Sequence, residues 1–321
     1  MDVAHPKLDA LGHAVDYRLR LSLGRDMGGA VTAGVDALHP RWQLPGSPAP
    51  KVRTALHTAG LELLDLIRRH LDSGGTYLDE GTLSRLCFVA AYYEDIFRIG
   101  RVHRFNFLTR ADEHITLRRL ADAVDGYVPD DLAVQMHPAH EPFAPLRALP
   151  EAQRVCGPVF AGSADIGGAD ADFILGGLLI DCKATTRPRQ LGTAEIYQLA
   201  GYLLLDYDDE FGINQVGLYL SRQGHLITWT VPDFLRRLGA TTPLPALRHK
   251  LRDFLKAEAA AAAPAAPACL ETPRQFLAAE PAPGPGSPPG EGTSLRPGMG
   301  CSGRGRGRFP GSRCGVGSSE R

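Results

Sequence analysis

The stretch ADADFILGGLLIDCKA, residues 169–184, constrains the fold of this 321-residue chain more than any other segment. It consists of two short apolar runs on either side of Gly176 and Gly177. Adjacent glycines between apolar runs are typical of the tight turn of a β-hairpin, because glycine adopts the backbone conformation that such turns require. The stretch therefore predicts two antiparallel strands in which Phe173 pairs with Ile180, both facing the core.

Four charged residues lie along the arms of this hairpin. Counting outward from the turn, Asp172 faces Asp181, and two positions further out Asp170 faces Lys183. Because side chains alternate between the two faces of a strand, these four share one face, opposite to the apolar one. The hairpin thus predicts a patch of three carboxylates and one ammonium group.

The opposed carboxylates of Asp172 and Asp181 require an explanation. At a Cβ separation of about 5 Å they repel each other, and buried charges are unfavourable unless they are paired or bind a metal. A hard divalent cation such as Mg²⁺ or Mn²⁺, which prefers oxygen ligands, would remove this repulsion, and Lys183 would orient or deprotonate a water molecule beside it. The alternative is a solvent-exposed polar face. Because Asp is a poor strand former, its repetition here favours the metal site.

The pattern before this hairpin is helical. Apolar residues at helical spacing predict helices over 54–71, from about Thr82 to the residue before Gly100, and over 114–124. Residues 127–150 are interrupted by proline and predict a long irregular connection. Further along we expect a strand over 157–166, a helix over 193–209, a second hairpin over 214–231 and a short helix over 231–239.

Composition divides the chain into segments. Beyond about Ala257 it is rich in Ala, Pro and Gly and then in Gly and Arg, which predicts disorder because little apolar area is available to bury. Elsewhere the apolar content suffices for a sizeable core. We expect an α/β (α+β) protein with four parts: an N-terminal extension over 1–51, a mainly helical region over 52–155, a β-rich core over 156–256 and a disordered low-complexity tail over 257–321.

An aspartate, a hairpin and an Asp-x-Lys triplet together resemble the signature of the PD-(D/E)XK nuclease superfamily. Here the pattern is carried by Asp172 and by the triplet that starts at Asp181. Gln198 and Tyr202, on the helix that comes next, resemble the QxxxY motif of the RecB-type exonuclease branch. The resemblance covers roughly residues 157–231.

The resemblance implies a fold and a site. The superfamily's common core is a helix, three strands, a helix and another strand. Residues 156–256 are therefore expected to form a restriction-endonuclease-like core, a central mixed sheet flanked by helices. Asp172, Asp181 and Lys183 would take the catalytic roles, with Mg²⁺ or Mn²⁺ as cofactor. The GSAD stretch that ends at Asp165 resembles the branch's GxxD motif, but the pairing across the hairpin favours Asp172 as the metal ligand.

Three residues are expected to support this site. Asp170, opposite Lys183, would hold the lysine's ammonium group in place. Gln198 and Tyr202 are four positions apart, so they share a helix face and would contact DNA phosphate or the attacking water. An ordinary exposed helix face with a half-buried tyrosine is the alternative.

Glu94 is a further candidate ligand. It is a carboxylate on the apolar stripe of the helix before Gly100. The stripe consists of Leu83, Cys87, Ala90, Glu94 and Phe97. The resemblance makes Glu94 an extra acidic metal ligand from the first helix of the core. A buried salt bridge with Arg98 or Arg101 explains the pattern equally well.

Charge, cysteine content and apolar runs limit the partners and the cellular compartment that we expect for the protein. Its formal net charge of -1 argues against binding nucleic acid through overall charge, but is compatible with a local basic groove. Its six cysteines form no CxxC pair, which predicts a reduced, cytoplasmic protein. The N-terminus has no signal-peptide pattern, and the apolar runs fall short of the ~20 residues that span a bilayer, so no membrane is expected. Because no GxxxxGK[ST] motif occurs, a helicase partner would be a separate chain.

Two functions are consistent with these observations. The first is a metal-dependent nuclease that hydrolyses DNA phosphodiester bonds in repair, recombination or defence. The alternative is a catalytically inactive, nuclease-like module that binds DNA or a protein; the complete set of acidic residues and lysine argues against it. A hydrolase for another phosphate substrate is also compatible with the hairpin. For the helical N-terminal region, DNA contact and dimerisation both stay open.

Overall fold

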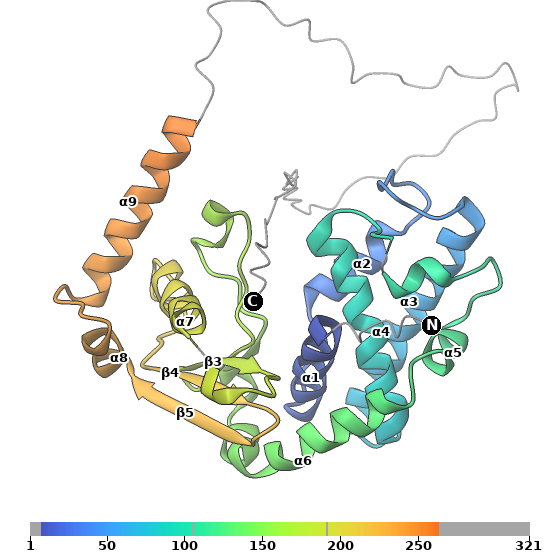
Figure 1. The fold of residues 1–321 in the computed structure, drawn as a ribbon, viewed down its shortest axis with the longest axis horizontal. Coiled ribbons are helices and arrows are strands. Elements are labelled where there is room, and N and C mark those ends of the chain that lie inside the picture. The colour runs from blue at the N-terminus through green and yellow to red at the C-terminus, as the bar shows by residue number, and fades with distance from the viewer. Residues whose placement is uncertain (1–7, 105, 191, 263–321) are drawn as a thin grey trace, which may run out of the picture.

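The computed structural model describes residues 8–104, 106–190 and 192–262. It confirms a mixed α/β protein in which helices cover both faces of a five-stranded sheet (Figure 1). Helices α1 to α6 pack on one face, and α7 to α9 pack on the other. None of the described helices combines the length and the apolar composition needed to cross a membrane.

The strands follow one another across the sheet in chain order. They are β1 (Arg154–Cys156), β2 (Phe173–Leu175), β3 (Leu178–Lys183), β4 (Gln215–Leu220) and β5 (His225–Thr230). Strands β3 and β4 are parallel, and all other neighbours are antiparallel. A parallel pair needs a crossover, which α7 (Thr193–Leu205) supplies. The mixed sheet and the second hairpin, β4–β5, are as predicted.

The β2–β3 hairpin has the predicted register. Phe173 lies opposite Ile180, and the two strands are joined by the two glycines. Gly176 and Gly177 have φ values of 60° and 82°, which side chains rarely tolerate. The turn chemistry therefore determines which residue faces which.

The predicted pairing of Asp170 with Lys183 is wrong. Strand β2 begins only at Phe173, so the first arm of the hairpin is shorter than the sequence predicts. Asp170 instead forms an isolated bridge with Val159 and accepts two hydrogen bonds, of 2.9 and 2.8 Å, from the guanidinium of Arg98. A bidentate arginine pair is stronger than a single contact across a hairpin, and it draws Asp170 towards the helices.

The helices predicted around 54–71, before Gly100, around 114–124 and after the hairpin are confirmed. The full set is α1 (Leu8–Ser22), α2 (Gly29–Ala37), α3 (Pro50–Asp72), α4 (Glu80–Ile99), α5 (Leu117–Asp122), α6 (Tyr127–Arg147), α7, α8 (Val231–Arg237) and α9 (Leu244–Ala262). Local signals define the ends of α4. Asp79 caps its first turn by accepting a hydrogen bond from the backbone of Thr82, and Gly100 ends it at a φ of 66°.

The irregular connection predicted over 127–150 is wrong, because this segment forms α6. Pro138, Pro142 and Pro145 lie within the helix and leave it without three backbone donors. Burial compensates for this loss, since the helix contributes one residue per turn to the core. These residues are Val128, Leu132, Gln135, Ala139 and Phe143.

The strand predicted over 157–166 is also wrong. The extended segment, β1, ends just before it, and Gly157 has a φ of 63°. Ser163 then holds a turn: its hydroxyl accepts a hydrogen bond from the Phe160 backbone and donates one to the Ala169 carbonyl. These contacts favour the short 3-10 helix Ser163–Ile166 over an extended chain.

Helix α9 corrects the predicted start of the disordered tail. The helix continues past Ala257 to Ala262, through a run of alanines. Alanine is the best helix former, so low complexity alone does not end a helix. The rest of the predicted tail, residues 263–321, lies outside the described residues.

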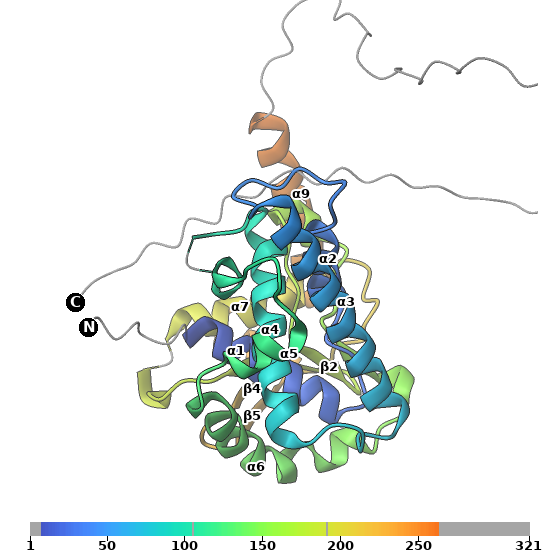
Figure 2. The same cartoon turned by 90° about the vertical axis from the view of Figure 1, so that its right-hand side faces the viewer.

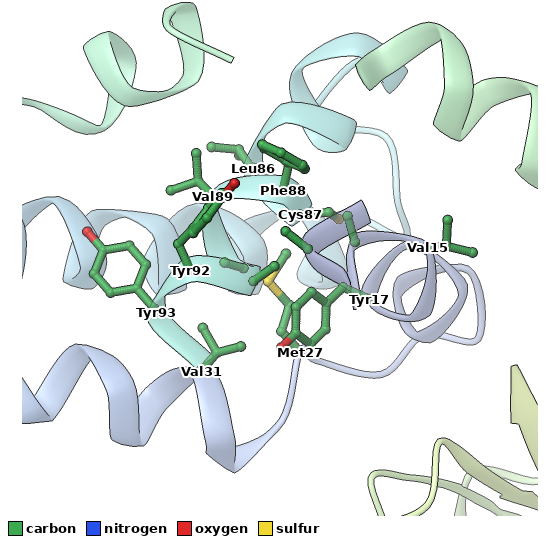
Figure 3. Close-up of a cluster of buried hydrophobic side chains, with 14 of the residues drawn as sticks. Val15, Tyr17, Met27, Val31, Leu86, Cys87, Phe88, Val89, Tyr92 and Tyr93 are labelled. Carbon is green, nitrogen blue, oxygen red and sulfur yellow. The ribbon is translucent and has the colours of Figure 1, made fainter. Parts of the chain in front are cut away.

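The core has two parts, one on each face of the sheet. Phe173, Ile180 and Tyr219 face the larger part, which is formed by α1 to α6. Side chains of α1, α2 and α4 interlock there, among them Tyr17, Val31 and Tyr93 (Figure 3). Residues 8–37, within the segment expected to be an extension, are thus built into this core. Figure 2 shows how these helices cover the sheet on that side.

Candidate active site

Asp181 and Lys183 lie on the face of β3 that points towards α7. Leu179, two residues earlier on the same face, belongs to the core under that helix. Asp172 precedes β2 by one residue, and its carboxylate accepts a 2.6 Å hydrogen bond from the backbone N–H of Cys182. The structure therefore brings Asp172, Asp181 and Lys183 to the same end of the hairpin.

Burial makes both carboxylates of this site unusually basic. Asp181 is 2% exposed, and desolvation, reinforced by the charge of Asp172, raises its pKa to about 7 against the opposing effect of Lys183. The pKa of Asp172 is also raised, mainly by burial. Near neutral pH, two buried carboxylates share one site, an unfavourable arrangement that a cation would relieve.

Lys183 connects the carboxylates to α7. Its Nζ lies 2.7 Å from Oδ2 of Asp181 and donates a 2.9 Å hydrogen bond to Oε1 of Gln198. The amide of Gln198 in turn donates a 2.8 Å hydrogen bond to the hydroxyl of Tyr202. Leu199, buried beside Gln198, fixes which face of α7 turns towards β3. The four polar side chains form one continuous chain of contacts.

Glu94 forms the ion pair with Arg98 that was the alternative to metal ligation. Its carboxylate lies 2.6 Å from Nε of Arg98 and 3.2 Å from Nδ1 of His13, and it also accepts a hydrogen bond from the hydroxyl of Tyr17. Arg98 bridges from Glu94 to Asp170. Glu94 is 3% exposed, so these partners satisfy a buried charge.

Helix α1 contributes charged residues that were not predicted from the sequence. Asp16 and Arg20 form a buried pair with a 2.7 Å separation, and burial raises the pKa of Asp16 to about 8. Arg20 lowers the pKa of Asp172, as does His13. His13, Asp16, Tyr17 and Arg20 recur at intervals of three or four residues, which is the spacing of one helix face. That periodicity was the available signal.

The three predicted metal ligands are not gathered into one cluster. In residues 8–104, 106–190 and 192–262, no group of three or more His, Cys, Asp or Glu side chains is arranged to hold a metal ion. The pair Asp172 and Asp181 fits a cation by its chemistry, since both are oxygen donors with raised pKa values. Glu94 is occupied by Arg98. Asp165, in the GSAD stretch, accepts a 2.9 Å hydrogen bond from Tyr207.

Comparisons with known proteins leave the family open. No protein-family model matches the sequence. No curated protein and no solved structure is similar to it at a significant level. The function of the chain is therefore inferred from the arrangement of its site.

Proposed function

We propose that this chain is a metal-dependent nuclease that hydrolyses phosphodiester bonds in DNA. The observation that carries the proposal is the position of Lys183, held between Asp181 and Gln198 beside a second buried carboxylate, Asp172. A restriction-endonuclease-like core is part of the proposal. It is supported by the order of β1, β2, β3, α7 and β4, with β4 parallel to β3.

Each residue of the site has a separate role in the proposed reaction. Asp172 and Asp181 would hold Mg²⁺ or Mn²⁺, which would supply a Lewis acid for the phosphate and lower the pKa of a bound water. Lys183 has three N–H donors; one is hydrogen-bonded to Gln198, and the ammonium group also forms an ion pair with Asp181. A remaining donor would contact the attacking water or a phosphate oxygen, where a positive charge stabilises the charge that develops during hydrolysis. Gln198 and Tyr202 restrict the position of the ammonium group.

The proposal is tested by incubating the purified chain with linear, circular and single-stranded DNA in Mg²⁺, in Mn²⁺ and in EDTA. We expect metal-dependent cleavage that is lost in Asp181→Asn. The matched control, Asp165→Asn, changes an aspartate outside the site and should cleave like the wild type. Binding of DNA without cleavage by the wild type in either metal would favour the inactive binding module instead.

A further inference from the structure

A hollow lies beside Lys183, between the end of β3 and the start of α7. Its volume is about 290 Å³, close to the lower end of the roughly 300–1,000 Å³ that ligand pockets span. The polar residues that line it include Lys183, Thr185, Arg187, Gln190 and Glu195. It therefore opens directly next to the ammonium group of the proposed active site.

The wall of this hollow is held in place by the β4–β5 turn. Arg222 donates a 3.0 Å hydrogen bond to the carbonyl of Ala184, and its guanidinium binds both carboxylate oxygens of Asp131 on α6. Gln223 donates a second contact, of 3.3 Å, to the carbonyl of Thr185. The segment that leaves β3 is thus attached to two other elements.

The positive charge of Arg187 is not neutralised within this wall. Its backbone N–H donates to the hydroxyl of Thr185 at 3.0 Å, and its side chain is exposed. Among the residues that the structure describes, no carboxylate forms an ion pair with it, although most of the other described arginines pair with an acid or a carbonyl. Glu195 is the acidic residue that lines the hollow, and one of its carboxylate oxygens accepts a 2.9 Å hydrogen bond from the backbone of Gly192.

We infer that this hollow binds one unpaired nucleotide of a DNA strand, with Arg187 contacting the phosphate next to the one being cleaved. This inference rests on the proposed nuclease function. It specifies the form of DNA that the site accepts, which is single-stranded DNA or a frayed duplex end. A guanidinium binds a phosphate through two parallel hydrogen bonds, and the hydroxyl and amide groups of Thr185 and Gln190 supply neutral contacts. Its volume of about 290 Å³ matches a single small ligand rather than two paired strands.

The test measures binding apart from cleavage. A fluorescently labelled oligodeoxythymidylate is titrated in EDTA with the wild type, Arg187→Ala, Arg187→Lys and Arg118→Ala. The last variant removes an equal charge from α5, where Arg118 forms an exposed pair with Asp122. We expect Arg187→Ala to raise the Kd about 5- to 10-fold and to reduce the slope of log K against log salt by about 0.7. Arg187→Lys should recover part of the loss, and Arg118→Ala should bind like the wild type.

Two results would overturn the inference. One is equal binding by Arg187→Ala and Arg118→Ala. The other is a blunt duplex that binds the wild type as tightly as the single strand does. The nuclease proposal can fail separately. If binding depends on Arg187 but the wild type cleaves no DNA in Mg²⁺ or Mn²⁺, the nucleotide site is supported and the nuclease activity is refuted.

Discussion

Two groups of charged residues meet at the hairpin, and they differ in how completely their charges are paired. On the side of α1 and α4, Arg98 lies between Glu94 and Asp170 and forms an ion pair with each of them. On the side of α7, Lys183 forms an ion pair with Asp181, whereas Asp172 forms none with any residue that the structure describes. Arg20 also lowers the pKa of Asp172, but Arg20 is itself paired with Asp16. Each carboxylate of the first group therefore contacts a cation, whereas the second contains a buried carboxylate, Asp172, that is held by a backbone hydrogen bond.

This difference separates a structural role from a functional one. A paired buried network mainly holds elements together, and removing one member leaves an uncompensated charge. An incompletely paired group costs stability and is retained where a ligand completes it. The comparison predicts that variants of the first group will lose stability, and that variants of the second will lose activity while keeping the fold.

The largest expected effect is on catalysis by Lys183→Met, which keeps the apolar stem and removes the charge. We expect kcat for DNA cleavage to fall about 10³-fold, because the variant lacks the positive donor next to the reacting phosphate. Stability should change by no more than about 1 kcal/mol. Single-turnover cleavage rates test the predicted loss of catalysis, and denaturant midpoints measured on the same preparation test the predicted stability. Cleavage within tenfold of the wild-type rate would contradict the role given to Lys183.

The next largest effect is on stability. Arg98→Ala should lower the free energy of unfolding by roughly 2 kcal/mol, because Glu94 and Asp170 lose the cation that they share. Glu94 is buried and cannot be resolvated, whereas the partial exposure of Asp170 limits the loss. Arg118→Ala, which breaks a mostly exposed pair with Asp122, is the control and should cost less than about 0.5 kcal/mol. Urea unfolding measures the free energy of unfolding of both variants. Equal decreases in Arg98→Ala and Arg118→Ala would show that the ion pairs of Arg98 stabilise the fold no more than an exposed surface pair does.

The smallest effect is expected for Tyr202→Phe. The change removes the hydroxyl that accepts a hydrogen bond from Gln198 but keeps the ring, which stacks against Phe160. One hydrogen bond is worth about 1 kcal/mol, so kcat should fall about 5-fold with KM unchanged. Tyr197→Phe, on the same helix but 64% exposed, should have no effect. If both variants behave alike, α7 does not position Lys183.

The hairpin could be predicted because its information is local. The turn glycines and the alternation of side chains determine the register, so the shared face of Asp181 and Lys183 follows from counting. Helices α3 and α4 were predictable for the same reason, since the spacing of their apolar residues repeats within a few turns.

The remaining features depend on contacts between segments that are far apart in the sequence. Arg98 withdraws Asp170 from the hairpin, and no local pattern indicates that pair. Helix α6 tolerates three prolines only because its buried face packs against α1 and α4. The spacing of His13 and Asp16 places them on one face of α1, but the segment against which that face packs is determined by contacts with distant parts of the chain.

The central claim, that Asp172 and Asp181 form a cation site, is tested most directly by the melting temperature as a function of pH with and without Mg²⁺. Because the folded-state pKa of Asp181 is raised to about 7 from an ordinary value of 3.8, the folded protein binds more protons than the unfolded chain between those values. In EDTA, stability should therefore fall as pH rises from 4 to 7, by on the order of 4 kcal/mol from Asp181 alone, and the contribution of Asp181 should then level off.

Mg²⁺ should offset more than half of that loss. At a concentration of about 100 Kd it adds roughly 2.7 kcal/mol, so the melting temperature at pH 8 should rise by about 5 °C, with little change at pH 5, where Asp181 is mostly protonated. Asp181→Asn should abolish the Mg²⁺ effect and remove the part of the pH dependence that Asp181 contributes, leaving the parts that come from Asp16 and Asp172. A melting temperature that does not respond to Mg²⁺ at pH 8, or that responds equally in Asp181→Asn, would contradict a cation site at these two carboxylates.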